Sequence, residues 1–194
     1  MTIAIIKYNA GNTASVINAL KRLGVEPILT DEPNLILSAD KVIFPGVGEA
    51  STAMNYLKTK GLDKVIRAIR QPFLGICLGM QLLCDFSEEG NTSCLGILPY
   101  KVYKFPTGKL KVPHVGWNSI FDPKGDLFRG IHENDFFYFV HSFYVEIGEK
   151  TTSYCDYGGC FSASIEHENF YAVQFHPEKS GDVGEKLLKN FIEL

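Results

Sequence analysis

The fold of this chain is decided by the stretch PFLGICLGMQLL, residues 72–83. A short apolar run leads into Gly75-Ile76-Cys77-Leu78-Gly79, and apolar residues at helical spacing follow from Met80. This order predicts a buried strand that turns sharply into a helix, with the Cys77 thiol presented at the turn as in a nucleophile elbow. The glycines fit such a turn, because a tight elbow leaves no room for Cβ atoms and strains the backbone.

A second motif, His176-Pro177-Glu178, supplies the partners that a reactive thiol needs. An imidazole can serve as the base for the thiol, and a carboxylate two residues later can fix its tautomer and orientation. Each motif alone has a simpler explanation, since buried cysteines are mostly inert and a histidine near a glutamate is usually a satisfied polar pair. Their joint occurrence favours a Cys-His-Glu site for acyl transfer.

The first half of the chain alternates short apolar strands with helical patterns. We expect strands at residues 3–8, 25–29, 42–44 and 72–76, and helices at 13–23, 50–58 and 62–70. Such alternation predicts a parallel sheet that is covered by helices on both faces. Active sites of these sheets lie at the carboxyl ends of the strands, where both Pro45-Gly46-Val47-Gly48 and the Cys77 elbow fall.

The second half of the chain has a different pattern. Short β-prone segments are separated by turn signals that contain glycine or proline, at residues 100–105, 112–121, 136–140, 143–147, 161–165 and 170–175. They predict antiparallel hairpins appended to the parallel sheet, with a closing helix around 183–191. We therefore expect one α/β domain over residues 1–194, with a mostly parallel central sheet flanked by helices.

Composition narrows the range of functions. The chain has 194 residues and a net charge of −3 without a stripe of Lys and Arg, so nucleic acid is not an expected partner. It shows no apolar run long enough to span a bilayer and no secretory signal, which predicts a cytoplasmic protein without a membrane partner. The five cysteines lack metal-ligand spacing, so we expect reduced thiols, no metal site and no cofactor.

The loop Pro45-Gly46-Val47-Gly48 is a candidate oxyanion site. Attack on an amide places negative charge on its carbonyl oxygen, and backbone N–H groups of Gly46, Val47 and Gly48 can approach that position closely. The N–H of Leu78, directly after the thiol and at the start of a helix, is a candidate second donor. A simple tight turn at this loop explains the motif equally well.

Three motifs of this chain resemble the class I (triad) glutamine amidotransferases over nearly its whole length. They are FPGVG at 44–48, GICLGMQ at 75–81 and QFHPEKS at 174–180. Three further pieces narrow the resemblance: YNAGN at 8–12 with Ser15-Val16, PHVGWN at 113–118 and VHSFY at 140–144. Together these are similar to the glutaminase subunits of imidazole glycerol phosphate synthase, which act in histidine biosynthesis.

The resemblance implies roles for individual residues. Cys77 would be the nucleophile, His176 the general base and acid, and Glu178 the orienting group, with Gly46, Val47 and Gly48 as the oxyanion strand. The walls of the glutamine pocket would be Gln81, Glu89, His141, Ser142 and Phe143. The family more often has tyrosine at the position of Phe143, and Glu89 is preferred to Glu88 for its distance from Cys77.

The resemblance also implies partners. The substrate would be L-glutamine, and the ammonia released would pass, within a heterodimer, to a cyclase partner that folds as a (β/α)8 barrel. That complex makes imidazole glycerol phosphate and an aminoimidazole carboxamide ribonucleotide. Asn12, Trp117 and Lys179 are the candidate interface residues.

Three alternatives stay open at the level of sequence. A glutaminase subunit of the same family that feeds a different acceptor synthase would have the same triad and a different partner surface. A cysteine peptidase on a similar scaffold would cleave peptides and leave glutamine intact. A regulatory module without activity would not show selective labelling of Cys77 over the other four cysteines.

Overall fold

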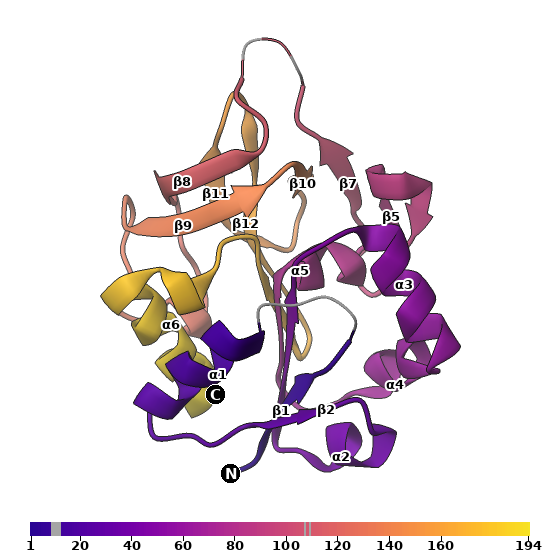
Figure 1. Ribbon diagram of the computed structural model, residues 1–194. Helices are drawn as coiled ribbons and strands as arrows, with labels where there is room; N and C mark the ends of the chain where they lie inside the picture. Colours follow the sequence, from indigo (N-terminus) through magenta and orange to yellow (C-terminus); the bar gives the residue numbers. More distant parts are fainter. Residues whose placement is uncertain (9–12, 107, 109) are drawn as a thin grey trace.

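Seven strands form the central sheet of the computed structural model, which describes residues 1–8, 13–106, 108 and 110–194 (Figure 1). Their order across the sheet is β11-β12-β13-β4-β3-β1-β2. The parallel strands are β1 (Ile3–Ile6), β2 (Ile28–Thr30), β3 (Lys41–Gly46), β4 (Phe73–Cys77) and β13 (Phe170–Val173). The antiparallel pair β11 (Thr151–Asp156) and β12 (Cys160–His167) completes one side.

Helices cover both faces of this sheet (Figure 1). On one face, α1 (Thr13–Arg22) and α6 (Gly181–Glu193) pack against side chains such as Ile5 and Ile76. On the other face, α2 (Pro33–Ser38), α3 (Ala50–Thr59), α4 (Leu62–Ala68) and α5 (Leu78–Leu83) pack against side chains such as Phe44 and Phe73. Successive side chains of a strand point to opposite faces, so strands that are buried on both sides are apolar throughout.

Two smaller sheets extend the fold beyond the carboxyl ends of the parallel strands. One has the order β10-β7-β5-β6, with bounds Phe143–Val145, Lys101–Lys104, Phe86–Ser87 and Thr92–Ser93. The other is a ribbon of β8 (His114–Ser119) and β9 (Phe136–His141). Short 3-10 turns lie at η1 (Glu89–Asn91), η2 (Asp126–Phe128) and η3 (Pro177–Lys179). The ribbon is tied to η3, because the backbone N–H of His176 donates to the carbonyl of Tyr138 over 2.9 Å.

The expected fold class is confirmed, including the parallel sheet and the appended antiparallel strands. Several local elements differ from the expectations, since α2, β5 and β6 were also not expected. The strand expected at 25–29 is β2, Ile28–Thr30, because the N–H of Val25 donates to Leu20 at the end of α1. Strand β11 was not expected, since its sequence TTSYCD is largely polar, yet Thr151, Ser153 and Cys155 point inward and are buried.

Buried hydroxyls explain how a polar strand enters the sheet. Thr151 pairs with Ser162 over 2.7 Å, and Ser153 pairs with Ser164 over 2.7 Å. Each hydroxyl satisfies its neighbour, which removes most of the cost of burying it. Within the described ranges, no helix combines the length and the apolar character that crossing a bilayer requires.

Candidate active site

Cys77 lies at the turn between β4 and α5 in a strained conformation. Its φ of 53° and ψ of −109° are unusual for a residue with a side chain. Such a conformation costs about 1–3 kcal/mol and persists only where the surroundings hold it. Here β3 provides that support: Gly46 stands beside Cys77 in the parallel register, and a Cβ on Gly79 would overlap the carbonyl oxygen of Phe44. The expected elbow is present.

The neighbouring strand β13 brings His176 and Glu178 to the same end of the sheet. Val173 is paired with Ile76, so the residues that follow β13 pass beside Cys77. The Nδ1 of His176 donates to Oε1 of Glu178 over 2.8 Å, and both side chains are only 2% exposed. The other ring nitrogen, Nε2, makes no hydrogen bond with any described residue.

The pKa of His176 is set by opposing effects. Burial lowers it, whereas the charge of Cys77 and the Glu178 carboxylate raise it, to about 10 overall. The ring is therefore protonated at neutral pH. An imidazolium beside a thiol favours the nucleophilic thiolate form of that thiol.

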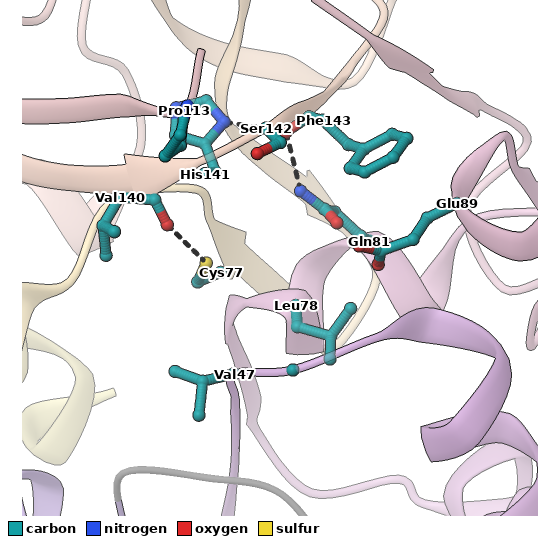
Figure 2. Close-up of a pocket in the computed structure, with 11 residues that line it drawn as sticks. Val47, Cys77, Leu78, Gln81, Glu89, Pro113, Val140, His141, Ser142 and Phe143 are labelled. Atoms are coloured by element: carbon teal, nitrogen blue, oxygen red, sulfur yellow. Dashed lines mark hydrogen bonds between the residues drawn. The ribbon is translucent and has the colours of Figure 1, made fainter.

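The sulfur of Cys77 has two further polar neighbours. Its thiol donates to the carbonyl oxygen of Val140 on β9 over 3.8 Å, as Figure 2 shows, and Nε2 of Gln174 donates to the sulfur over 3.6 Å. In this conformation the thiol proton points toward the ribbon rather than toward His176. A side-chain rotation of Cys77 would redirect it.

A cavity of about 290 Å³ opens beside Cys77. Its walls come from the β3–α3 loop, the elbow, η1 and the β8–β9 ribbon with the residues that follow it (Figure 2). The lining residues are Val47, Gly48, Cys77, Leu78, Gln81, Glu89, Pro113, Val140, His141, Ser142 and Phe143. The five residues expected in a glutamine pocket thus surround the thiol. Gly46, His176 and Glu178 do not line the cavity, and they lie buried near Cys77.

Glu89 rather than Glu88 faces this cavity. Its Oε2 accepts the N–H of Ala50 at the start of α3 over 2.9 Å. Burial raises the pKa of Glu89, and the Ala50 hydrogen bond lowers it in part. Glu88 is exposed and accepts the N–H of Lys104 on β7 over 2.7 Å, so its carboxylate faces β7 and not the cavity.

A chain of hydrogen bonds supports the wall formed by residues 141–143. Nδ1 of His141 donates to the carbonyl of Phe143 over 2.7 Å, and Nε2 of His141 lies 3.1 Å from Nδ1 of His114. Burial lowers the pKa of His141 to about 3 and that of His114 to about 4. Both rings are neutral at physiological pH, so His114 donates to His141.

The candidate interface residues fall in different places. Asn12 lies outside the described residues. Trp117 is 55% exposed on β8, and Lys179 is exposed in η3. Val115 and Phe136 are also more than half exposed, and together with Trp117 they form what we call the ribbon face. The opposite side of the ribbon packs into the core through Phe137 and Phe139, and the backbone carbonyl of Val140 accepts the Cys77 thiol.

Sequence reasoning did not select four residues that lie at the site: Pro113, Val140, Gln174 and His114. Gln174 stands in the motif that contains His176 and is fully buried against Cys77. His114 stands in the PHVGWN motif and stacks on Tyr157 with ring centroids 3.9 Å apart. Their motif positions were the available signal, but only the register of β13 and of the ribbon shows what they contact. Among the described residues, no group of three or more His, Cys, Asp or Glu side chains could hold a metal ion.

Comparison with known proteins gives one consistent family. The model of the class-I glutamine amidotransferases matches residues 4–194. The chain is 57% identical over 196 residues to the imidazole glycerol phosphate synthase subunit HisH of Bacteroides fragilis, and 47% identical to that of Blochmanniella floridana, covering 100% of both chains in each case. It is 44% identical to the HisH subunit of Vibrio parahaemolyticus, covering 99% of this chain and 98% of that one.

Solved structures have the same fold at low sequence identity. A putative GMP synthase protein from Thermoplasma acidophilum has a TM-score of 0.77 and 19% identity, and covers 100% of this chain and 92% of its own. A structure of PurLQS from Thermotoga maritima has a TM-score of 0.72 and 18% identity, covering 99% and 97%.

Proposed function

Since the chain belongs to the class-I glutamine amidotransferase family and, within it, to the HisH subunits of imidazole glycerol phosphate synthase, we propose that it releases ammonia from L-glutamine with Cys77, His176 and Glu178. It is the glutaminase subunit of an enzyme of histidine biosynthesis. One observation carries the proposal. Cys77 is held in a strained turn next to a buried His176–Glu178 pair and opens onto a cavity of about 290 Å³.

The first step forms a thioester. The Cys77 thiolate attacks the side-chain carbonyl carbon of glutamine, and the carbonyl oxygen becomes an oxyanion. Backbone N–H groups of the Gly46–Gly48 loop and of Leu78 would stabilise that charge. His176, protonated at neutral pH, gives its proton to the departing nitrogen, so ammonia leaves and a glutamyl thioester remains.

The second step restores the enzyme. His176 is now neutral and takes a proton from water while the oxygen of that water attacks the thioester carbon. Glutamate leaves, and Cys77 returns to the thiolate beside an imidazolium. Glu178 holds the ring orientation in both steps through the 2.8 Å hydrogen bond to Nδ1.

The cavity suits the amino-acid end of glutamine. Both N–H groups of Gln81 are taken, by the Phe143 carbonyl and by Gln174, so only its oxygen is left for a ligand. The Glu89 carboxylate adds a second acceptor in the same cavity. An oxygen and a carboxylate together would bind the α-ammonium group of L-glutamine and select against substrates without one.

The ribbon face is the proposed docking surface for the cyclase partner, which we expect to be a (β/α)8 barrel. Free ammonia is protonated in bulk water near neutral pH, so the acceptor site must lie across a dry contact. Val115, Trp117 and Phe136 expose apolar surface on the ribbon whose Val140 carbonyl contacts Cys77. Lys179 and Asn12 are proposed as further contacts, and a cytoplasmic location is proposed because the pattern of the five cysteines in the sequence favours reduced thiols.

Glutamine hydrolysis by purified variants tests the proposal. Cys77→Ser should lower the glutaminase rate by several orders of magnitude in the presence of the cyclase and its nucleotide ligand, because the nucleophile is replaced by a much weaker one. Cys160→Ser, at an exposed cysteine away from the cavity, is the matched control and should keep the parent rate. A Cys77→Ser rate close to the parent's would rule out the triad.

A second candidate is a glutaminase of the same family that feeds another acceptor synthase. The full-length match to HisH subunits favours the histidine pathway. Adding the cyclase should raise the glutaminase rate and yield imidazole glycerol phosphate. If the cyclase neither binds nor changes the rate, the second candidate is preferred.

A further inference from the structure

Gln174 has no role in the chemistry described so far, yet its side chain contacts the reactive sulfur. It follows β13 directly, and the parallel register of β13 with β4 sets it beside Cys77. Its side chain is fully buried. The amide makes two contacts: Nε2 lies 3.6 Å from the sulfur of Cys77, and Oε1 lies 2.9 Å from Nε2 of Gln81.

The neighbours of the Gln174 amide determine which of its two ends is the NH2 group. The carbonyl oxygen of Phe143 can only accept, so the end of the Gln81 amide that faces it over 2.9 Å must be the NH2 group. The second N–H of that group points at Gln174, whose facing atom must therefore be its oxygen. The NH2 group of Gln174 is then the end that faces the sulfur.

The other end of this series of hydrogen bonds, at His114 and His141, is consistent with the same donor and acceptor assignment. The Phe143 carbonyl also accepts from Nδ1 of His141, whose ring is neutral because burial lowers its pKa to about 3. Each donor in the series from His114 through His141, Phe143 and Gln81 to Gln174 therefore has one acceptor. Reversal of the Gln174 amide would set two N–H groups against each other and an oxygen against the sulfur.

We propose that Gln174 is a positioning residue for Cys77: its buried N–H holds the sulfur at the cavity and stabilises the thiolate. The inference deepens the proposed function and rests on Cys77 as the nucleophile. In the thiol form, the S–H of Cys77 donates to the Val140 carbonyl. In the thiolate form the sulfur has no proton to donate to that carbonyl, whereas the Gln174 N–H donates a charge-assisted hydrogen bond to the sulfur.

The test is the pH dependence of Cys77 alkylation by iodoacetamide, followed by peptide mass spectrometry. Gln174→Met keeps the length of the side chain and removes the donor. We expect the midpoint of Cys77 alkylation to rise by about one pH unit, which corresponds to about 1.4 kcal/mol, so that at pH values below the parent's midpoint the rate slows about tenfold. The exposed Cys160 in the same sample is an internal reference, and its profile should not change.

A second variant removes dependence on one substitution. Gln174→Glu keeps the shape and the acceptor for Gln81 but sets a carboxylate against the sulfur, so the midpoint should rise further. Ser162→Ala is the control for lost stability: this buried hydroxyl on β12 bonds to Thr151 and to the Glu146 carbonyl and does not contact Cys77. It should keep the parent profile.

The results of these experiments distinguish a role of Gln174 in positioning Cys77 from a role in packing alone. A positioning role predicts that the glutaminase kcat of Gln174→Met falls most at pH values below the midpoint of Cys77 alkylation and recovers as the pH is raised. Alkylation profiles of both Gln174 variants that superimpose on the parent's would overturn the inference. Failure of the proposed function looks different, because Cys77→Ser would then retain glutaminase activity whatever the alkylation of Cys77 shows.

Discussion

Gly46→Ala is the sharpest test of how the elbow is held. An added Cβ would lie 2.6 Å from the backbone nitrogen of Gly79 and 2.7 Å from both Leu78 Cβ and the Tyr8 hydroxyl. Ordinary contacts begin at 3.4 Å, so the added atom would be about 0.8 Å too close to the backbone of α5. Strand β3 and the elbow must therefore separate by most of that distance.

Two effects of opposite sign decide the outcome. Replacing glycine with alanine reduces the freedom of the unfolded chain, which alone stabilises a protein by about 0.4–1 kcal/mol. Overpacking against backbone costs about 1–3 kcal/mol. We expect a net loss of about 1–2 kcal/mol in the free energy of unfolding, from urea titrations. Displacing the thiol by most of an ångström should also slow glutamine hydrolysis about 100-fold.

Gly75→Ala is the matched control on the adjacent strand β4. Its Cβ would meet its nearest neighbours, in Gly79 and Leu83, at 3.1 Å, a much smaller overlap. This variant should lose less stability and less activity than Gly46→Ala. If Gly46→Ala unfolds at the parent's urea concentration and keeps the parent's activity, the close approach of β3 to the elbow is not what holds Cys77.

Three other predictions concern titration and docking. The pKa values of His114 and His141, about 4 and about 3, lie below the ordinary 6.5, so these two side chains take up protons at a higher pH in the unfolded chain than in the folded one. The free energy of unfolding, measured in urea, should therefore fall as the pH drops from 6.5 toward 4. His114→Gln should reduce that fall. The pKa of His176 is raised to about 10, so its contribution to the free energy of unfolding is complete below pH 6.5 and is lost as the pH rises toward 10. Glu178→Gln should narrow that pH range and lower the glutaminase rate about 100-fold or more. An unchanged loss of stability at alkaline pH in urea titrations would contradict this role of Glu178. Trp117→Ala should weaken cyclase binding by about 2 kcal/mol in calorimetry, whereas Leu35→Ala, at an exposed leucine of α2, should not. Equal affinities of the two variants would show that the ribbon face is not the docking surface.

The sequence predicted the parts of the fold that follow simple periodic patterns. The apolar strands around Ile5, Ile43 and Leu74 and the helix spacing after Thr13 sufficed for the parallel sheet and its flanking helices. Strand β11 was missed because its inward positions Thr151 and Ser153 are hydroxyls that satisfy one another. Their partners lie on β12, and pairing between strands is not visible in one segment.

The site shows the same division. The elbow and the His-Pro-Glu motif are local patterns, so Cys77, His176 and Glu178 could be named as candidates from sequence. The contacts of Gln174 depend on which strand lies beside β4, and those of His114 depend on the pairing of β8 with β9. Both residues carry side chains that are common in structural roles, so residue type alone gave no reason to select them.

The place of β13 between β12 and β4 has a consequence for synthesis of the protein. A ribosome completes β4 and its thiol nearly a hundred residues before Phe170–Val173 emerge. Until then one edge of β4 is open, and His176, the proposed base for the thiol, has not been made. If the proposed triad is correct, an unfinished polypeptide cannot consume glutamine, and the last strand to be made both closes the sheet and brings His176 beside Cys77.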